Sequence, residues 1–260
     1  MADLRLGGMV TEDSGGSGPA VVLIHGLGGD SNSFAPLMEA LDGYRVLRPD
    51  LPGAGRSALR PGRPGLNGLA AAIRDTLRLA GIERAHFAGH SMGTLICQYL
   101  AAESPGIVLS LALFGPILEP LPAARQALRE RAEAARRTGM AGIADAVSQA
   151  SLAAASRETN PVTEAFVRES LMRQSPAGYA AHCLALATAP AADHGAIGCP
   201  TLLIAGEKDP VAPVAMAEAL RGRISGAGLE VLPGVGHWIP IEMPRRSAEL
   251  LRAHLDKSAL

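Results

Sequence analysis

The sequence predicts an α/β fold with a doubly wound, mostly parallel sheet and an inserted helical cap. Short β-like runs alternate with helix-like stretches along most of the chain, which is typical of parallel strands joined by right-handed crossovers. One long stretch in the middle is helical by composition and contains no β-like run. At 260 residues, 48% of them hydrophobic, the chain is long enough to bury a sizeable core.

The first expected strand is residues 21–24, four consecutive apolar residues that suit a strand buried on both faces. The further β-like runs are residues 44–47, 85–88, 108–114, 201–205 and 229–232. The helix-like stretches are residues 34–41, 69–80, 92–102, 214–220 and 246–254. Because open α/β sheets bind ligands at the carboxyl ends of their strands, we expect functional residues in the loops that follow strands.

Residues 117–190 interrupt this alternation, and we expect them to form the helical cap, with residues 1–116 and 191–260 as the core. The arginines of this stretch are nearly balanced by acidic residues. We therefore interpret several of them as a solvated helix face that pairs with nearby glutamates. These arginines are Arg125, Arg129, Arg131, Arg136 and Arg137.

Charge and cysteine usage exclude several classes of function. The 24 Lys and Arg residues balance 25 Asp and Glu residues without a basic tract, so neither nucleic acid nor a membrane surface is an expected partner. Three cysteines without CxxC spacing indicate neither a disulfide framework nor a metal site, and no cofactor is expected. Without a secretory segment or a spanning apolar run, we expect a cytoplasmic protein. The sequence indicates no particular oligomeric state.

The sequence Gly-His-Ser-Met-Gly at residues 89–93 follows the 85–88 run and opens the 92–102 helix. A serine on such a tight strand-to-helix turn projects its hydroxyl above the sheet edge, and the flanking glycines let the backbone reverse without collision. We therefore predict that Ser91 is a nucleophile.

A serine hydroxyl needs a base to take its proton and an acid to orient that base. Asp209 follows the 201–205 run, and His237 follows the 229–232 run. The chain order Ser91, Asp209, His237 is the order of the α/β-hydrolase arrangement.

We assign His237 as the general base and then general acid, and Asp209 as the carboxylate that fixes its tautomer. The sequence offers one rival acid, Glu119, just past the 108–114 run.

Residues 25–29, His-Gly-Leu-Gly-Gly, directly follow the first strand. Their glycines allow the backbone to turn back beside Ser91, so we expect the backbone N–H groups of Leu27 and Met92 to form an oxyanion hole. His25 is interpreted as a residue that orders this loop.

Two glycine-rich segments do not support nucleotide binding. Residues 53–58 match G-x-G-x-x-A, but the prolines and glycines at 61–65 leave no helix start to receive a pyrophosphate. Residues 26–31 lack the Gly-Lys-Ser/Thr ending of a phosphate-binding loop.

These residues resemble the α/β-hydrolase superfamily over nearly the whole chain. The matching segments include residues 25–26, 50–57 and 89–93 and the loops of Asp209 and His237. Within it, the cap is similar to that of 3-oxoadipate enol-lactonases at residues 137–146, 160–161 and 178–183. One departure is that Ser-Gln-Ala-Ser-Leu at 148–152 stands where that family usually has an aromatic residue.

The resemblance implies a serine hydrolase that cleaves a small ester or lactone through an acyl-enzyme. The enol-lactonase-like cap implies a substrate that bears a carboxylate and arises in aromatic breakdown, with Arg125, Arg136 and Arg137 as candidate partners. A general carboxylesterase, a carbon–carbon bond hydrolase of ring-cleavage products and a cofactor-free oxygenase or perhydrolase remain open alternatives. A non-catalytic receptor on the same fold also remains open.

Overall fold

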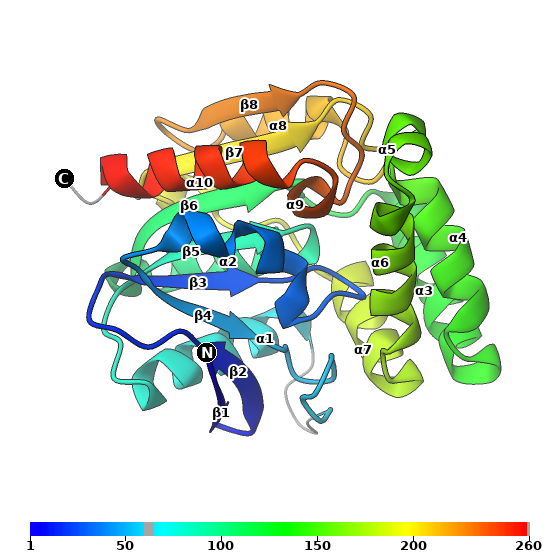
Figure 1. Cartoon of the computed structure of the whole chain (residues 1–260), viewed down its shortest axis with the longest axis horizontal. Coiled ribbons are helices and arrows are strands. Elements are labelled where there is room, and N and C mark those ends of the chain that lie inside the picture. Colours follow the sequence, from blue (N-terminus) through cyan, green and yellow to red (C-terminus); the bar gives the residue numbers. More distant parts are fainter. Residues whose placement is uncertain (60–64, 259–260) are drawn as a thin grey trace.

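A computed structural model describes residues 1–59 and 65–258 of the chain, and these form a layered α/β structure around one eight-stranded sheet (Figure 1). Residues 61–64, whose prolines and glycine argue against a dinucleotide-binding site, lie outside the described part. The strands are β1 (Ala2–Leu6), β2 (Met9–Asp13), β3 (Ala20–Ile24), β4 (Arg45–Pro49), β5 (Ala85–His90), β6 (Val108–Phe114), β7 (Thr201–Gly206) and β8 (Gly228–Leu232). Their order is β1-β2-β4-β3-β5-β6-β7-β8, and the six strands from β4 to β8 run parallel.

The predicted doubly wound, mostly parallel sheet is confirmed, and all six expected strands are present. The antiparallel strands β1 and β2 at the sheet edge were not predicted. β1 is largely exposed and mixes charged with apolar residues, so it lacks the continuous apolar run that identified the buried strands.

Helices cover both faces of the sheet. On one face are α1 (Gly65–Leu79), α2 (Met92–Glu103) and α8 (Val214–Arg221), and on the other are η1 (Ser31–Leu41) and α10 (Pro244–Ser258) (Figure 1). η1, expected as an ordinary helix, is a 3₁₀ helix that contains Pro36. Proline has no N–H to donate to an α-helical hydrogen bond, which favours the irregular form.

Successive side chains of a strand point to opposite faces of the sheet and pack against different helices. Val21 and Leu23 of β3 pack with η1 and α10, whereas Val22 and Ile24 pack in the cluster that contains α1 and α2. A strand buried on both faces has no polar side, which explains the unbroken apolar sequence of β3.

Between β6 and β7 the chain forms helices only, and we call residues 117–190 the helical insertion. Its helices are α3 (Pro122–Thr138), α4 (Ala141–Ser151), α5 (Ala154–Thr159), α6 (Pro161–Met172) and α7 (Pro176–Ala187). The carboxyl ends of the parallel strands point toward these helices (Figure 1). The division into a core and a separate cap domain stays a prediction.

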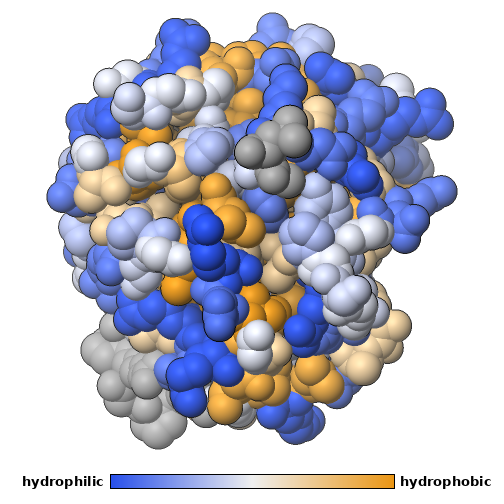
Figure 2. All heavy atoms as spheres, turned by 90° about the vertical axis from the view of Figure 1, so that its left-hand side faces the viewer, coloured by the Kyte–Doolittle hydropathy of each residue, from blue (hydrophilic) through white to orange (hydrophobic). Residues whose placement is uncertain are grey.

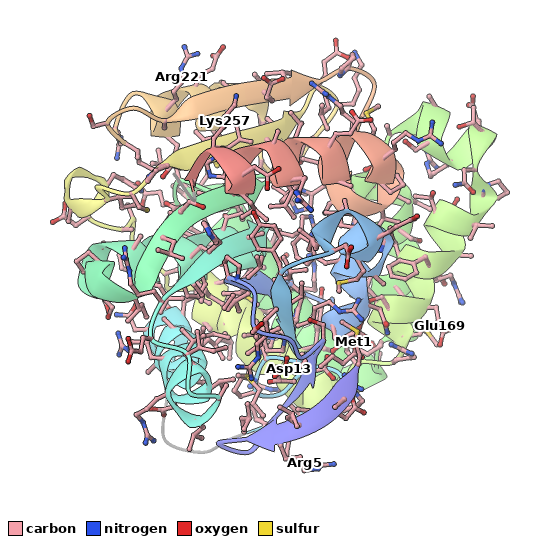
Figure 3. All side chains as sticks on the ribbon, turned by 60° about the vertical axis from the view of Figure 1, so that its left-hand side comes forward. Met1, Arg5, Asp13, Glu169, Arg221 and Lys257 are labelled. Atoms are coloured by element: carbon pink, nitrogen blue, oxygen red, sulfur yellow. The ribbon has the colours of Figure 1, made fainter. Side chains whose placement is uncertain are left out.

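The surface away from the insertion is mixed in character. Figure 2 shows hydrophilic residues interspersed with smaller hydrophobic areas on that face. Arg5, Glu169 and Arg221 are exposed and lie at the edge of the molecule in Figure 3. Within the described ranges, no helix has the length and apolar character needed to cross a bilayer.

A buried histidine joins the insertion to the core. His182 of α7 is buried, and its Nε2 donates a hydrogen bond to the Pro52 carbonyl at 2.9 Å. Burial and the nearby His25 lower the pKa of His182 from 6.5 to about 4, although the hydrogen bond to Pro52 acts in the opposite direction. The folded protein therefore binds fewer protons here than the unfolded chain between pH 6.5 and 4, so acidification through this range destabilises it.

We predict that His182→Gln, which keeps a donor for the Pro52 carbonyl, flattens this acid dependence. The loss in free energy of unfolding between pH 7 and pH 5 should be about 2 kcal/mol smaller than in the wild type. Urea unfolding at both pH values measures the difference. Equal pH dependence in the two proteins would show that His182 does not carry this effect.

Candidate functional site

Ser91 lies at the turn between β5 and α2 in a strained backbone conformation. Its φ of 53° and ψ of −119° make it the one non-glycine residue with positive φ in the described part of the chain. Such a conformation costs of order 1–3 kcal/mol and persists only where the surroundings enforce it. The Ser91 N–H donates to the Phe114 carbonyl at 2.9 Å, which ties the turn to the end of β6.

Two glycines allow the backbone to pack closely around this turn. A Cβ at Gly93 would lie 2.2 Å from the Ile24 carbonyl oxygen, and one at Gly26 would lie 2.9 Å from the Ser91 Cβ. Since real Cβ atoms do not approach so closely, a side chain at either position would push β3 or its loop away from Ser91.

A chain of hydrogen bonds connects Ser91, His237 and Asp209. The Ser91 Oγ lies 2.8 Å from His237 Nε2, and His237 Nδ1 lies 2.7 Å from Asp209 Oδ2. Each of the three residues is only 5% exposed. The structure thus brings together the three side chains that the sequence analysis selected from loops after β5, β7 and β8.

The Asp209 carboxylate is held in place on both oxygens. Its Oδ1 accepts hydrogen bonds from the N–H groups of Val211 and Ala212, both at 2.8 Å. Burial alone would raise the pKa of Asp209, but the charge and hydrogen bond of His237 and these two N–H groups outweigh it and lower the pKa. Asp209 is therefore ionised at neutral pH and favours a proton on His237 Nδ1.

The loop after β3 lies beside this chain. Leu27 lines the same cavity as Ser91 and His237, and the Gly29 N–H closes a turn onto the Gly26 carbonyl at 3.1 Å. Met92 is the first residue of α2, where an N–H group has no intrahelical acceptor. These two N–H groups are the expected oxyanion donors, and that role stays a prediction.

The ring of His25 stabilises the loop after β3 through two hydrogen bonds. Its Nδ1 donates to the Gly26 carbonyl at 2.8 Å, and its Nε2 accepts from the Leu51 N–H at 3.0 Å. One donor and one acceptor nitrogen correspond to a neutral ring. Burial lowers the pKa of His25, in keeping with this neutral form and with the loop-ordering interpretation.

His90, inside the Gly-x-Ser-x-Gly sequence, supports the other side of the site. Its Nε2 donates to the His237 carbonyl at 2.8 Å, and its ring lies 5.0 Å from the His237 ring. Burial and nearby His237 lower the pKa of His90 to about 3. His90 is therefore a neutral hydrogen-bond donor to the backbone of His237 across the physiological pH range.

The rival acid, Glu119, pairs with another residue. It lines the cavity, but its carboxylate lies 3.3 Å from Arg125 Nη2, and it is Asp209 that contacts the His237 ring. Arg125 also donates to the Ala187 carbonyl at 2.9 Å, and Arg136 and Arg137 are exposed.

A cavity of about 880 Å³ opens above Ser91, between the core and the helical insertion. Its walls are mostly apolar, with the hydroxyl of Ser91 and the ring of His237 on the core side. The insertion contributes Leu128, Ala134, Ile143, Val147 and Leu186. A cavity of this size and character suits a small organic molecule.

A cationic side chain also lines this cavity. Arg131 of α3 lines the cavity wall, contrary to our interpretation of it as part of a solvated helix face. The Arg131 guanidinium interacts with the side chain of the buried Tyr179. Burial raises the pKa of this phenol, and the positive charge of Arg131 opposes the rise. Among the described residues no ion pair joins Arg131 to a carboxylate, whereas Arg168 pairs with Asp145 at 2.6 Å. Sequence periodicity did not identify Arg131, because its direction depends on how α3 packs against α7.

The chain belongs to the α/β hydrolase fold family, whose model matches residues 19–244. The 3-oxoadipate enol-lactonase 1 of Acinetobacter baylyi is 30% identical over 238 residues, which are 89% of this chain and 86% of that protein. A shorter match, 39% identical over 104 residues, spans only 28% of another curated relative.

Two solved structures are similar over almost the whole chain. The enol-lactonase from Burkholderia xenovorans LB400 has a TM-score of 0.90 at 29% identity, with 98% of this chain and 100% of that chain covered. A malate-bound thermophilic esterase from Thermogutta terrifontis has a TM-score of 0.91 at 26% identity, with 99% and 98% covered. The chain is thus a hydrolase with enol-lactonase-like features.

Proposed function

We propose that the protein is a serine hydrolase that cleaves a small carboxylic ester or lactone through an acyl-enzyme, with Ser91, His237 and Asp209 as its catalytic triad. One observation carries the proposal: the hydrogen-bonded chain from Asp209 through His237 to Ser91 ends at an apolar cavity of about 880 Å³. A base within reach of the hydroxyl and an ionised acid behind that base are what acyl transfer requires.

In the first half of the reaction, Ser91 Oγ attacks the substrate carbonyl carbon while His237 Nε2 takes the hydroxyl proton. The carbonyl oxygen becomes an oxyanion that accepts hydrogen bonds from the N–H groups of Leu27 and Met92. Asp209 stabilises the imidazolium through Nδ1. When the tetrahedral intermediate collapses, the carbon–oxygen bond breaks and the alkoxide receives the proton from Nε2.

In the second half, water attacks the acyl-enzyme, and His237 takes one of its protons. Collapse of this second intermediate releases the carboxylic acid, and Ser91 Oγ regains its proton from Nε2. For a lactone, the alcohol freed in the first half stays attached to the acyl group and leaves with it. No group beyond substrate and water is needed.

We predict that Ser91→Ala lowers kcat for a p-nitrophenyl acyl ester by at least 10³-fold, because loss of one triad member removes most of the rate enhancement. Initial rates of p-nitrophenol release measure the effect. A fluorophosphonate should label the wild type on Ser91 and leave the variant unlabelled. Labelling of another residue, or wild-type rates in the variant, would overturn the assignment.

For the substrate, we propose a small ester or lactone that bears a carboxylate, bound by Arg131. In a largely apolar wall, a guanidinium that forms no ion pair with the described carboxylates favours an anionic group, since a charge-assisted hydrogen bond there compensates its desolvation. The enol-lactonase relatives and the malate-bound esterase support a small anionic ligand. A general carboxylesterase is the second candidate, favoured by the esterase similarity and by the many apolar wall residues.

We predict that Arg131→Met lowers kcat/KM for a carboxylated lactone or ester by about 10- to 100-fold, the value of one charge-assisted hydrogen bond. A neutral ester of equal size should change less than threefold. Arg129→Met, on the exposed side of α3, is the matched control and should affect neither substrate.

Steady-state kinetics with paired carboxylated and neutral substrates measure both effects. If the wild type prefers neutral esters by tenfold or more, about 1.4 kcal/mol of transition-state preference, the anionic-substrate proposal is wrong and the carboxylesterase candidate replaces it. An equal loss for both substrates in Arg131→Met would assign Arg131 a packing role.

A further inference from the structure

A carboxylate outside the cavity joins the His237 loop to the helical insertion. Glu242 Oε2 accepts hydrogen bonds from the Gly236 N–H at 3.0 Å, the Ala153 N–H at 3.0 Å and the Ser156 hydroxyl at 2.7 Å. Its Oε1 accepts from the Trp238 N–H at 3.0 Å. Two of the four donors flank His237, and the other two belong to the insertion.

The same two segments also contact each other directly. The His237 N–H donates to the Ser151 carbonyl at 2.8 Å, and Trp238 Nε1 donates to the Ser151 Oγ at 3.0 Å. A Cβ at Gly236 would lie 2.5 Å from the Ala153 backbone nitrogen. The backbone of the base loop therefore packs against the insertion without side chains between them.

The residue type at position 242 fits this arrangement. A carboxylate has two acceptor oxygens and no donor, so it accepts from all four groups at once. Glutamine has the same shape, but its NH₂ group would face donors where one of the oxygens now accepts. The short helix α9 (Ile239–Glu242) brings residue 242 back beside Gly236 and Trp238.

We propose that Glu242 is a positioning residue for the base: it fastens the His237 loop to residues 151–156 and so keeps His237 within hydrogen-bond distance of Ser91. This inference rests on the proposed function. Glu242 does not line the cavity in the described structure, so its effect on the reaction passes through the backbone of His237. The insertion thereby supports the catalytic machinery as well as covering it.

The test compares Glu242→Gln with the wild type and with Glu249→Gln, a matched change at an exposed glutamate of α10. Glu242→Gln should lower kcat at least tenfold and change KM less than threefold, because a displaced base slows proton transfer more than it weakens substrate binding. Glu249→Gln should change neither constant. Rates are expressed per site titrated with a fluorophosphonate, so that unfolded protein is not counted.

A proton NMR spectrum separates positioning from simple stability. The proton between His237 Nδ1 and Asp209 should give a low-field resonance in the wild type and in Glu249→Gln, and this resonance should shift or broaden in Glu242→Gln. An unchanged resonance with kcat within twofold of the wild type would overturn the role of Glu242. If the wild type itself is not labelled at Ser91, the proposed function fails instead.

Ser156→Ala provides a second route to the same question, because it removes one donor on the insertion side and leaves the His237 loop intact. We expect a loss in kcat of at least threefold with unchanged KM, and no further loss when it is added to Glu242→Gln, since both changes act on one carboxylate. If Glu242→Gln does not fold, Ser156→Ala alone decides, and wild-type kcat in this variant would overturn the proposal.

Discussion

The left-handed backbone of Ser91 is the constraint on which the site depends. A conformation that costs of order 1–3 kcal/mol must be enforced by neighbours, and here the end of β6, the loop after β3 and the start of α2 all meet at that residue. Because these elements converge there, the hydroxyl stands at the carboxyl edge of the sheet, where the loops after β7 and β8 begin. The Asp209–His237–Ser91 chain follows from this convergence.

The helical insertion covers the candidate site and also forms hydrogen bonds with the loops that build it. The C-terminal end of α6 contacts the loop that carries Leu27. There the Ser170 hydroxyl donates to the Gly28 carbonyl at 2.8 Å, and Arg173 pairs with Asp30. The 151–156 segment of the insertion meets the base loop through Glu242. The insertion thus contacts both sides of the candidate site, and movement of its helices would alter the alignment of the site as well as its access.

Much of the fold was predictable from sequence because the parallel strands are short, mainly apolar runs, several of which are followed by glycine-containing loops. Ser91, Asp209 and His237 stand in such loops, so their convergence followed from the topology of the sheet. The β1–β2 edge lacked this signal because β1 is largely exposed and both strands mix charged or polar residues with apolar ones. Arg131 and Glu242 depend on how helices and loops far apart in the chain pack together, and no local pattern encodes those contacts.

The most direct measurement of the central claim is the mass of the protein during turnover. Wild-type enzyme mixed with a p-nitrophenyl acyl ester and quenched in acid within milliseconds should carry one added acyl group, located by peptide mapping on Ser91, and the group should disappear as substrate is exhausted. The Ser91→Ala protein should carry none. Turnover without an acyl group on the protein, or an acyl group on a different residue, would contradict the account.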